Sequence, residues 1–296
     1  MSDLAVLASH ESFSQWRASI FEEPIMFIPT MGALHHGHLA LIATARSYLK
    51  SHHNSSGKIV VSIYVNPTQF TEISDFENYP NTLDDDIRLC DHNAVDVLFL
   101  PRESDIYPEG LNQVVSLDPG TKAQGLESIG RPGHFAGVIT VLDRLFNIVM
   151  PNAAFFGEKD FQQLAVVTDY FSSKSAQLKI ISVPTVRDSS GIALSSRNER
   201  LSITGQGLAK QIPAAFALAE HLLSEGHSIA ETRNAVADYL ANQPGISFEY
   251  FEILTDELLQ VIEPGRARML LAVSVNSVRL IDNLPVEIRK ENVISD

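Results

Sequence analysis

The chain has 296 residues, of which 45% are hydrophobic and 20% charged, so it is not an intrinsically disordered protein and is long enough for one large or two ordinary domains. Its 36 acidic against 22 basic side chains give a formal net charge of −14, and with no run of Lys or Arg we expect no nucleic-acid partner. One cysteine, no charged leader and no apolar run of about 20 residues predict a soluble cytoplasmic protein with no membrane partner.

Strand and helix patterns alternate through the first 183 residues. The apolar run Ile25–Thr30 predicts a buried strand, and apolar residues at helical spacing predict a helix over His38–Lys50. The alternation continues with strands at Lys58–Val65, Val95–Leu100, Ala153–Phe156 and Leu178–Val183, a helix that begins near Thr82, and helices over Phe135–Met150 and Asp160–Phe171. This order predicts an α/β fold, with a Rossmann-like doubly wound parallel sheet over residues 1–183.

The pattern changes after residue 183. Pro184 and Asp188-Ser-Ser-Gly191 are typical of turns and indicate a hinge. Helical stretches at Gly205–Ser224 and Ile229–Ala241 are followed by strands at Phe248–Thr255 and Arg266–Leu280. We therefore expect a smaller α+β domain over residues 184–296, which closes as a lid over a reactive intermediate.

A cluster of histidines lies between the first predicted strand and its helix. A helix start presents unpaired N–H groups and a partial positive charge, so it favours phosphate. Gly32 and Gly37 allow a ligand to approach the backbone closely, while His35 and His38 can donate hydrogen bonds to phosphate oxygens. The loop is therefore interpreted as a nucleotide site, with a surface cluster or an adventitious metal site as the alternative; we expect His36 to be a spacer.

His35-His36-Gly37-His38 resembles the H-x-G-H signature of the class I aminoacyl-tRNA synthetase and nucleotidyltransferase superfamily. Five motifs between residues 25 and 200 narrow this resemblance. They are Ile28-Pro-Thr-Met-Gly-Ala-Leu-His-His-Gly-His38, Val65-Asn-Pro-Thr-Gln-Phe70, Arg131-Pro-Gly-His-Phe135, Phe156-Gly-Glu-Lys-Asp-Phe-Gln-Gln163 and Leu194-Ser-Ser-Arg-Asn198. In this order they are similar to the motifs of the pantothenate synthetase (pantoate–β-alanine ligase) family.

The resemblance implies an ATP site that includes a version of the K-M-S-K-S loop. The implied ATP-binding residues are Met31, Gly32, His35, His38, Gly157, Lys159, Asp160, Val186, Leu194, Ser195, Ser196 and Arg197. Among them, His35, His38 and Lys159 are expected to be catalytic, because they steady charge that develops on the phosphates. Taken alone, Lys159 fits a solvated surface lysine equally well, and the Ser-Ser-Arg stretch fits a helix-capping turn.

The resemblance also implies that Gln69, Gln163 and Asn66 form the pantoate site, in which Asn66 orients the loop. Neutral amides can hold a hydroxy acid without neutralising the carboxylate that must act as nucleophile. Mg²⁺ is expected with ATP, and Asp85 is expected to reach it, through water. Acids in a first helical turn have a structural explanation as well, because Thr82 and Asp85 fit a helix cap.

These expectations combine into a ligase that condenses pantoate with β-alanine through a pantoyl adenylate and releases AMP and pyrophosphate. A nucleotidyltransferase acting on another small substrate and a non-catalytic nucleotide-binding module are the alternatives; the net charge disfavours a tRNA synthetase. The resemblance also implies a homodimer. The chain departs from the family in the Phe70–Phe76 loop and at Tyr79-Pro80-Asn81, where the family usually has an arginine.

Overall fold

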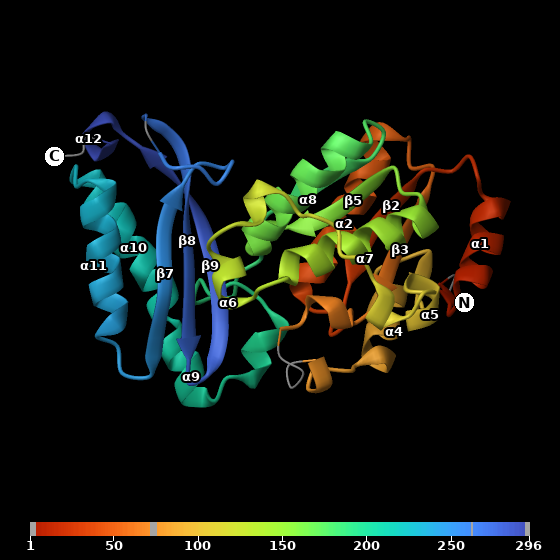
Figure 1. The fold of residues 1–296 in the computed structure, drawn as a ribbon, viewed down its shortest axis with the longest axis horizontal. Helices are drawn as coiled ribbons and strands as arrows, with labels where there is room; N and C mark the ends of the chain where they lie inside the picture. The colour runs from red at the N-terminus through yellow and green to blue at the C-terminus, as the bar shows by residue number, and fades with distance from the viewer. Residues whose placement is uncertain (1–3, 72–75, 262, 294–296) are drawn as a thin grey trace. The chain divides into compact units, whose positions relative to one another are not determined.

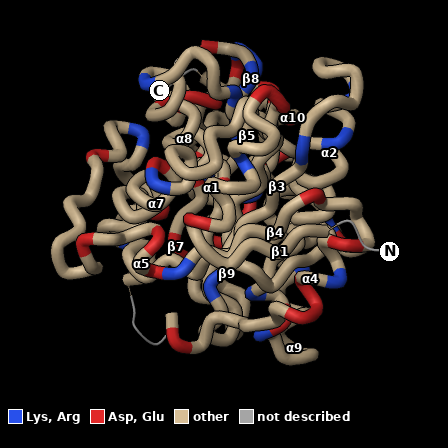
Figure 2. The backbone as a smooth tube through the Cα atoms, turned by 90° about the vertical axis from the view of Figure 1, so that its right-hand side faces the viewer, with Lys and Arg blue, Asp and Glu red and all other residues tan. Residues whose placement is uncertain are grey.

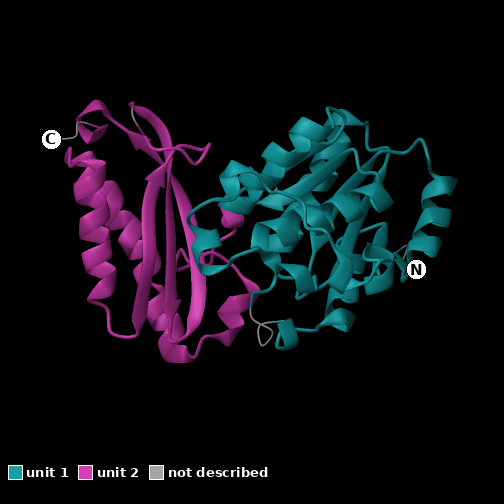
Figure 3. Cartoon of the chain, in the orientation of Figure 1, with its two compact units in different colours: residues 1–158, 162–184 teal, residues 159–161, 185–296 magenta. Residues whose placement is uncertain are grey.

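The computed structural model describes residues 4–71, 76–261 and 263–293 and divides the chain into two compact units (Figures 1 and 3). Unit 1 comprises residues 1–158 and 162–184, and unit 2 comprises residues 159–161 and 185–296. The three residues 159–161 thus belong with the C-terminal unit, although the chain on both sides of them belongs to unit 1. Separate folding of residues 1–183 and 184–296 as domains stays a prediction.

Unit 1 is built on a parallel sheet of six strands. Their order is β1 (Ala5–Leu7), β4 (Val97–Phe99), β3 (Lys58–Ile63), β2 (Ile25–Thr30), β5 (Ala153–Gly157) and β6 (Lys179–Val183). The doubly wound sheet predicted from the sequence is confirmed. The strand order reverses between β2 and β5, and in such sheets ligands bind beyond the carboxyl ends of the strands at that reversal.

The faces of this sheet are covered by helices. Their bounds are α1 (His10–Ser19), α2 (His36–His52), α4 (Leu83–His92), α5 (Glu103–Ile106), α6 (Glu127–Gly130), α7 (His134–Val149) and α8 (Phe161–Lys174), with short 3₁₀ turns η1 (Pro67–Gln69), η2 (Leu111–Gln113), η3 (Thr121–Ala123) and η4 (Glu158–Asp160). In β2, Ile25 and Phe27 pack in the core with α1, α7 and α8, whereas Met26 and Ile28 pack in the core with α2 and α4. Burial on both faces explains why β2 reads as a continuous apolar run.

Cys90 lies in α4 and packs in the core beneath that helix. It is fully buried, and this burial raises the pKa of its thiol to about 12. The thiol therefore stays protonated at neutral pH, and its burial confirms that Cys90 is a packed residue.

Unit 2 contains an antiparallel sheet in the order β7 (Ile246–Leu254), β8 (Gly265–Val275) and β9 (Val278–Ile288). Helices α9 (Ile203–Ala209), α10 (Gln211–Ser224), α11 (Ile229–Ala241) and α12 (Lys290–Val293) accompany it, and the turn η5 (Ser196–Arg200) precedes them. Residues of α9, α10 and α11 share one apolar core with the three strands. This arrangement confirms the smaller α+β part of the predicted fold.

Two expected elements of unit 2 are wrong in detail. The strand expected over Arg266–Leu280 is a hairpin, because Asn276 and Ser277 both have positive φ angles, of 46° and 72°, and form a two-residue turn between β8 and β9. The single helix expected over Gly205–Ser224 is two helices that meet at Lys210. Pro213 has no N–H group with which to continue the first helix, so it lies in the first turn of a new one.

Charged residues are dispersed along the chain. In the view of Figure 2, the Lys and Arg positions are short segments that are separated by acidic or uncharged ones. Among the described residues, no helix combines the length and the apolar character that crossing a membrane requires.

Candidate functional site

The backbone between β2 and α2 turns sharply at Gly32 and Ala33, whose φ angles are 85° and 51°. The Thr30 hydroxyl accepts a hydrogen bond from the Gly32 N–H (3.2 Å) and donates one to the Ser62 carbonyl (2.7 Å). A side chain at position 32 would lie 3.1 Å from the Asp86 carboxylate and would adopt a strained φ. Glycine at this position therefore lets the loop close against the neighbouring helix.

Asp86, in α4, fixes the same loop from the other side. Its carboxylate accepts hydrogen bonds from the backbone N–H groups of Ala33 (3.0 Å) and Leu34 (2.8 Å), and the side chain is almost fully buried. The expected helix cap between Thr82 and Asp85 is wrong, because the Thr82 hydroxyl lies 3.3 Å from the Asp86 carboxylate and caps no backbone N–H. Within the acidic run Asp84–Asp86, Asp86 therefore holds the loop between β2 and α2 in place, a role that the sequence analysis did not predict.

Replacing Asp86 by Asn should destabilise the protein by about 1–3 kcal/mol, because the amide can accept only one of the two N–H bonds well and loses the charge. Activity should fall with stability, since the loop carries the two histidines. Urea denaturation and steady-state kinetics measure the two effects. Asp85→Asn is the matched control: Asp85 is exposed and paired with Arg88, so its stability should change by no more than about 0.5 kcal/mol. Equal stability loss in both variants would contradict the anchoring role of Asp86.

His35 and His38 form a capping box at the start of α2. The His35 Nδ1 accepts from the Gly37 N–H (3.1 Å), and the His38 Nδ1 accepts from the His35 backbone N–H (3.2 Å). The two ring centroids are 4.2 Å apart. Because each Nδ1 is an acceptor, each neutral imidazole carries its proton on Nε2, which makes both Nε2–H groups hydrogen-bond donors. His36 begins the helix and is exposed.

Asn66 organises the turn that follows β3. Its Nδ2 donates to the Gln69 Oε1 (3.2 Å) and to the Gly137 carbonyl (3.3 Å), while its Oδ1 accepts from the Tyr107 hydroxyl (2.8 Å). Asn66 is 1% exposed, so both ends of its amide are bonded inside the protein. Asn66 thus ties the turn to α7 and to Tyr107, and its assignment to the pantoate site stays a prediction.

Gln69 is thereby held beside the histidine loop. The Gln69 Nε2 lies 2.8 Å from the Met31 Sδ, and the backbone carbonyl of Gln69 accepts a hydrogen bond from the His134 Nδ1 (2.8 Å). His134 begins α7, which packs along η1. The structure therefore brings Gln69, expected to bind pantoate, together with Met31, expected to bind ATP.

The two adjacent glutamines of α8 differ in their surroundings. Gln162 is buried; its Oε1 accepts from the Glu127 N–H (3.0 Å), and its Nε2 donates to the carbonyls of Lys122 and Gln124 (both 3.1 Å). Gln163 is half-buried, and its amide makes no hydrogen bond within the part of the chain that the structure describes. Gln162 thus anchors a loop, and Gln163 is the one suited to a ligand.

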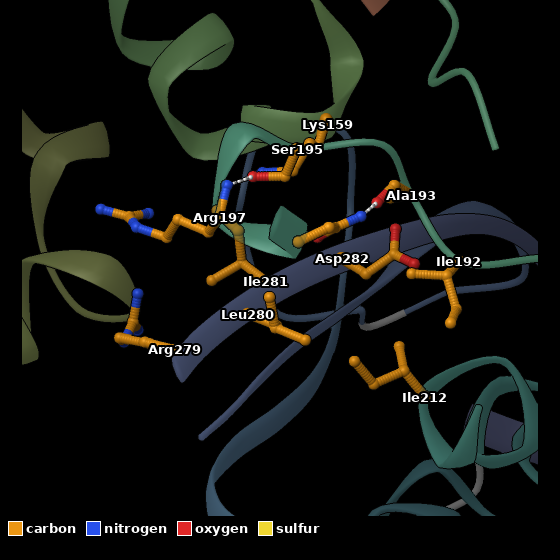
Figure 4. A pocket seen from close by; sticks show the side chains of 11 residues that line it. Lys159, Ile192, Ala193, Ser195, Arg197, Ile212, Arg279, Leu280, Ile281 and Asp282 are labelled. Atoms are coloured by element: carbon orange, nitrogen blue, oxygen red, sulfur yellow. Dashed lines mark hydrogen bonds between the residues drawn. The ribbon is translucent and has the colours of Figure 1, made fainter. Parts of the chain in front are cut away.

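A pocket within unit 2 gathers the other expected phosphate contacts (Figure 4). Lys159, Ser195 and Arg197 line it, and the Ser195 Oγ accepts a hydrogen bond from the Arg197 N–H (3.3 Å). Asp160 pairs with the Lys159 ammonium at 3.5 Å. Arg279, from β9, also lines the pocket, and its guanidinium is paired with the Glu249 carboxylate (2.8 Å). The sequence interpretation missed Arg279, because it placed this residue near the end of one long strand instead of just after a hairpin turn.

The remaining expected ATP contacts lie on short, well-defined segments. The Leu194 N–H donates to the Val186 carbonyl (2.9 Å), and Ser196 begins η5. Gly157 ends β5, which neighbours β2 in the sheet. The expected ATP-binding residues thus form two sets: Met31, Gly32, His35, His38 and Gly157 in unit 1, and Lys159, Asp160, Val186, Leu194, Ser195, Ser196 and Arg197 in unit 2.

The described side chains form no dedicated metal centre. In residues 4–71, 76–261 and 263–293, no group of three or more His, Cys, Asp or Glu side chains is arranged to hold an ion. Asp85 is exposed and its assignment to Mg²⁺ stays a prediction. The atypical loop before Asn81 includes residues 72–75, which lie outside the described residues.

Comparison with known proteins agrees with these features. Residues 5–285 match the family described as pantoate-beta-alanine ligase. The pantothenate synthetase of Coprothermobacter proteolyticus is 42% identical over 269 residues, which is 88% of this chain and 91% of the relative. A crystal structure of pantothenate synthetase from Thermus thermophilus has a TM-score of 0.84 and 36% identity, with 95% of this chain and 98% of that chain covered. A pantoate-beta-alanine ligase from Francisella tularensis, complexed with beta-gamma ATP and beta-alanine, has a TM-score of 0.78 and 35% identity, with 95% and 97% covered. The chain therefore belongs to the pantoate–β-alanine ligase family.

Proposed function

We propose that the chain condenses pantoate with β-alanine at the expense of ATP, through a pantoyl adenylate. The observation that carries this proposal is the pair of imidazoles at the start of α2, whose Nε2–H groups are set as donors beside the strand-order reversal. Phosphate binds well at such a helix start, because N–H groups and the helix dipole act together. Family membership supplies the identity of the acid and the amine.

In the first step a carboxylate oxygen of pantoate attacks the α-phosphorus of ATP. The bond from that phosphorus to the bridging oxygen breaks, and pyrophosphate leaves with the electron pair. His35 and His38 donate hydrogen bonds to the phosphate oxygens, and Lys159, Ser195 and Arg197 stabilise the departing charge. Asp160 contacts the ribose in this proposal.

In the second step the amine of β-alanine attacks the acyl carbon of the adenylate. The bond from that carbon to the phosphate oxygen breaks, AMP leaves with the electron pair, and the nitrogen releases its extra proton to water as the amide of pantothenate forms. In the first step, Gln69 and Gln163 hold pantoate through neutral amides, so the pantoate carboxylate keeps the charge that makes it a nucleophile. No covalent bond to the protein is needed in either step.

Mg²⁺ enters this scheme as part of the substrate, bound to the phosphates of ATP. The exposed carboxylate of Asp85 suits contact with a hydrated ion through water, and no cluster among the described residues argues for a protein-held one. A rise in the apparent KM for Mg–ATP in Asp85→Asn would bear this out. We extend the proposal to a cytoplasmic homodimer, and light scattering of the purified protein tests the dimer.

Product analysis tests the proposed reaction. The protein is incubated with ATP, Mg²⁺ and pantoate, with and without β-alanine. We expect pyrophosphate from both incubations, and stoichiometric AMP and pantothenate only with the amine. ADP in place of AMP would exclude adenylation. If the adenylate accumulates and β-alanine does not accelerate the release of AMP from it, the result would favour a nucleotidyltransferase. If the protein binds ATP but forms no pyrophosphate, the result would favour a non-catalytic module.

A further inference from the structure

Residues 159–161 are attached to unit 2 at both ends. The Asn283 Nδ2, from β9, donates a hydrogen bond to the carbonyl of Lys159 (2.9 Å). Two residues further on, the Arg268 guanidinium lies 3.9 Å from the centroid of the Phe161 ring. These contacts explain why this segment belongs with the C-terminal unit, whereas residues 158 and 162 do not.

The two attachment points are joined to each other. The Arg268 Nη1 donates to the Asn283 Oδ1 (2.7 Å), and the Arg268 Nε donates to Asp256 (3.2 Å). Arg268 and Asn283 are each only 3% exposed. A guanidinium is buried so completely only where partners compensate for its lost hydration. The pair is therefore a fixed part of the unit 2 interior.

The hydrogen bonds determine how the Asn283 amide is oriented. A guanidinium can only donate, so the Asn283 atom that faces Arg268 must be the oxygen. The nitrogen then faces Lys159, whose carbonyl can only accept. The backbone of Asn283 is fixed as well, because its N–H donates to Asp282 (2.7 Å) and its carbonyl accepts from Arg187 (2.9 Å).

We propose that Asn283, oriented by Arg268, is a positioning residue for Lys159. It holds the backbone from which the lysine side chain extends into the pocket lined by Ser195 and Arg197. A lysine side chain has many rotamers, and a displacement of about 1 Å in a group that acts on the reacting atoms can lower a rate by roughly 10²-fold. The inference rests on the proposed function of Lys159 as a phosphate contact.

A double-mutant cycle between Lys159→Ala and Asn283→Ala tests this inference. Lys159→Ala should lower kcat by roughly 10²-fold, as expected for the loss of one well-placed donor. Asn283→Ala should lower kcat by about 10-fold or more, and the double variant should match Lys159→Ala within about twofold, because Asn283 acts through the lysine. If the two losses multiply, Asn283 does not act through Lys159 and the inference fails.

Asn292→Ala is the matched control. Asn292 is buried in the same unit, and its Nδ2 donates to the carbonyls of Leu223 (2.9 Å) and His227 (2.8 Å). The Asn292→Ala variant should lower the thermal midpoint of unfolding about as much as Asn283→Ala does. Its kcat should stay within about twofold of wild type, and it should show no coupling to Lys159→Ala. Coupling of the same size at Asn292 would mean that general destabilisation, and not positioning, links the two sites.

A second variant and a binding measurement test the same inference if Asn283→Ala cannot be used. If Asn283→Ala does not fold, as judged by circular dichroism, Asn283→Asp carries the same cycle, because its carboxylate still accepts from Arg268 but offers no donor to Lys159. The Kd of inorganic pyrophosphate is measured by calorimetry for every variant, with the same non-additive pattern expected. The pyrophosphate binding cycle needs no pantoate and does not depend on the reaction. If the wild-type protein forms no AMP, the proposed function is overturned. The positioning role of Asn283 is then still decided by the pyrophosphate binding cycle.

Discussion

His38→Gln should lower kcat by roughly 10²–10³-fold, while the free energy of unfolding changes by no more than about 0.5 kcal/mol. The reason is that His38 does two separable things. Its Nδ1 accepts from the His35 N–H as the third residue of α2, and its Nε2–H is the proposed donor to phosphate. Gln is a preferred residue at this position of a capping box, so it keeps the first role and removes the imidazole.

His35→Asn applies the same logic to the residue that caps the helix. Asn is among the strongest N-cap residues, and its side-chain oxygen can accept the N–H bond that His35 now accepts from Gly37. Stability should therefore be equal to wild type or higher, while kcat falls by roughly 10²-fold. A variant that is less active but no less stable is the signature of a group retained for chemistry and not for the fold.

His36→Gln is the control for both variants. His36 lies in the same turn and is exposed, and the change is the one made at position 38. Thermal unfolding followed by circular dichroism and initial rates of pyrophosphate release give the two readouts. Activity of His38→Gln within about threefold of wild type would remove the His38 imidazole from the mechanism, since replacing a well-placed donor by a displaced amide N–H should cost far more.

The strands and helices that could be predicted from the sequence are those whose pattern of apolar residues matches the side chains that the fold buries. β2 is apolar at successive positions because Phe27 and Met26 enter different cores, and this is visible without a structure. The histidine loop could be located because Gly32 and Gly37 mark a strand-to-helix turn. The hairpin between β8 and β9 was missed, although Asn276-Ser277 between apolar runs is a signal for a two-residue turn.

The supporting residues could not be found in the same way, because their roles depend on contacts between distant parts of the chain. Asp86 reads as an acid in a first helical turn, and only the fold brings it to the Ala33 N–H. Asn283 is 124 positions from the carbonyl that it binds. The residues expected to touch ligand follow from local motifs, whereas the residues that orient them depend on how the strands are ordered.

Gly137→Ala should destabilise the protein and, by displacing groups proposed to position substrate, lower activity by at least about 10²-fold. A Cβ at this position would lie 2.4 Å from the Thr68 carbonyl oxygen and 2.9 Å from the Gln69 nitrogen, so α7 and η1 could not keep their present separation. Overpacking of this kind costs about 1–3 kcal/mol, which outweighs the gain of up to about 1 kcal/mol from Ala in a helix. The displaced turn carries both Asn66 and Gln69.

The kinetic pattern should identify what has moved. Because Gln69 is the proposed pantoate contact, KM for pantoate should rise more than KM for ATP, in addition to the fall in kcat. Gly207→Ala is the control: this glycine lies in α9, an added methyl group would meet no other described segment within 4 Å, and the change should be neutral or stabilising by up to about 1 kcal/mol. If Gly137→Ala lost stability but kept both KM values, the turn would not orient the pantoate site, and Gln69 would have to be assigned a structural role.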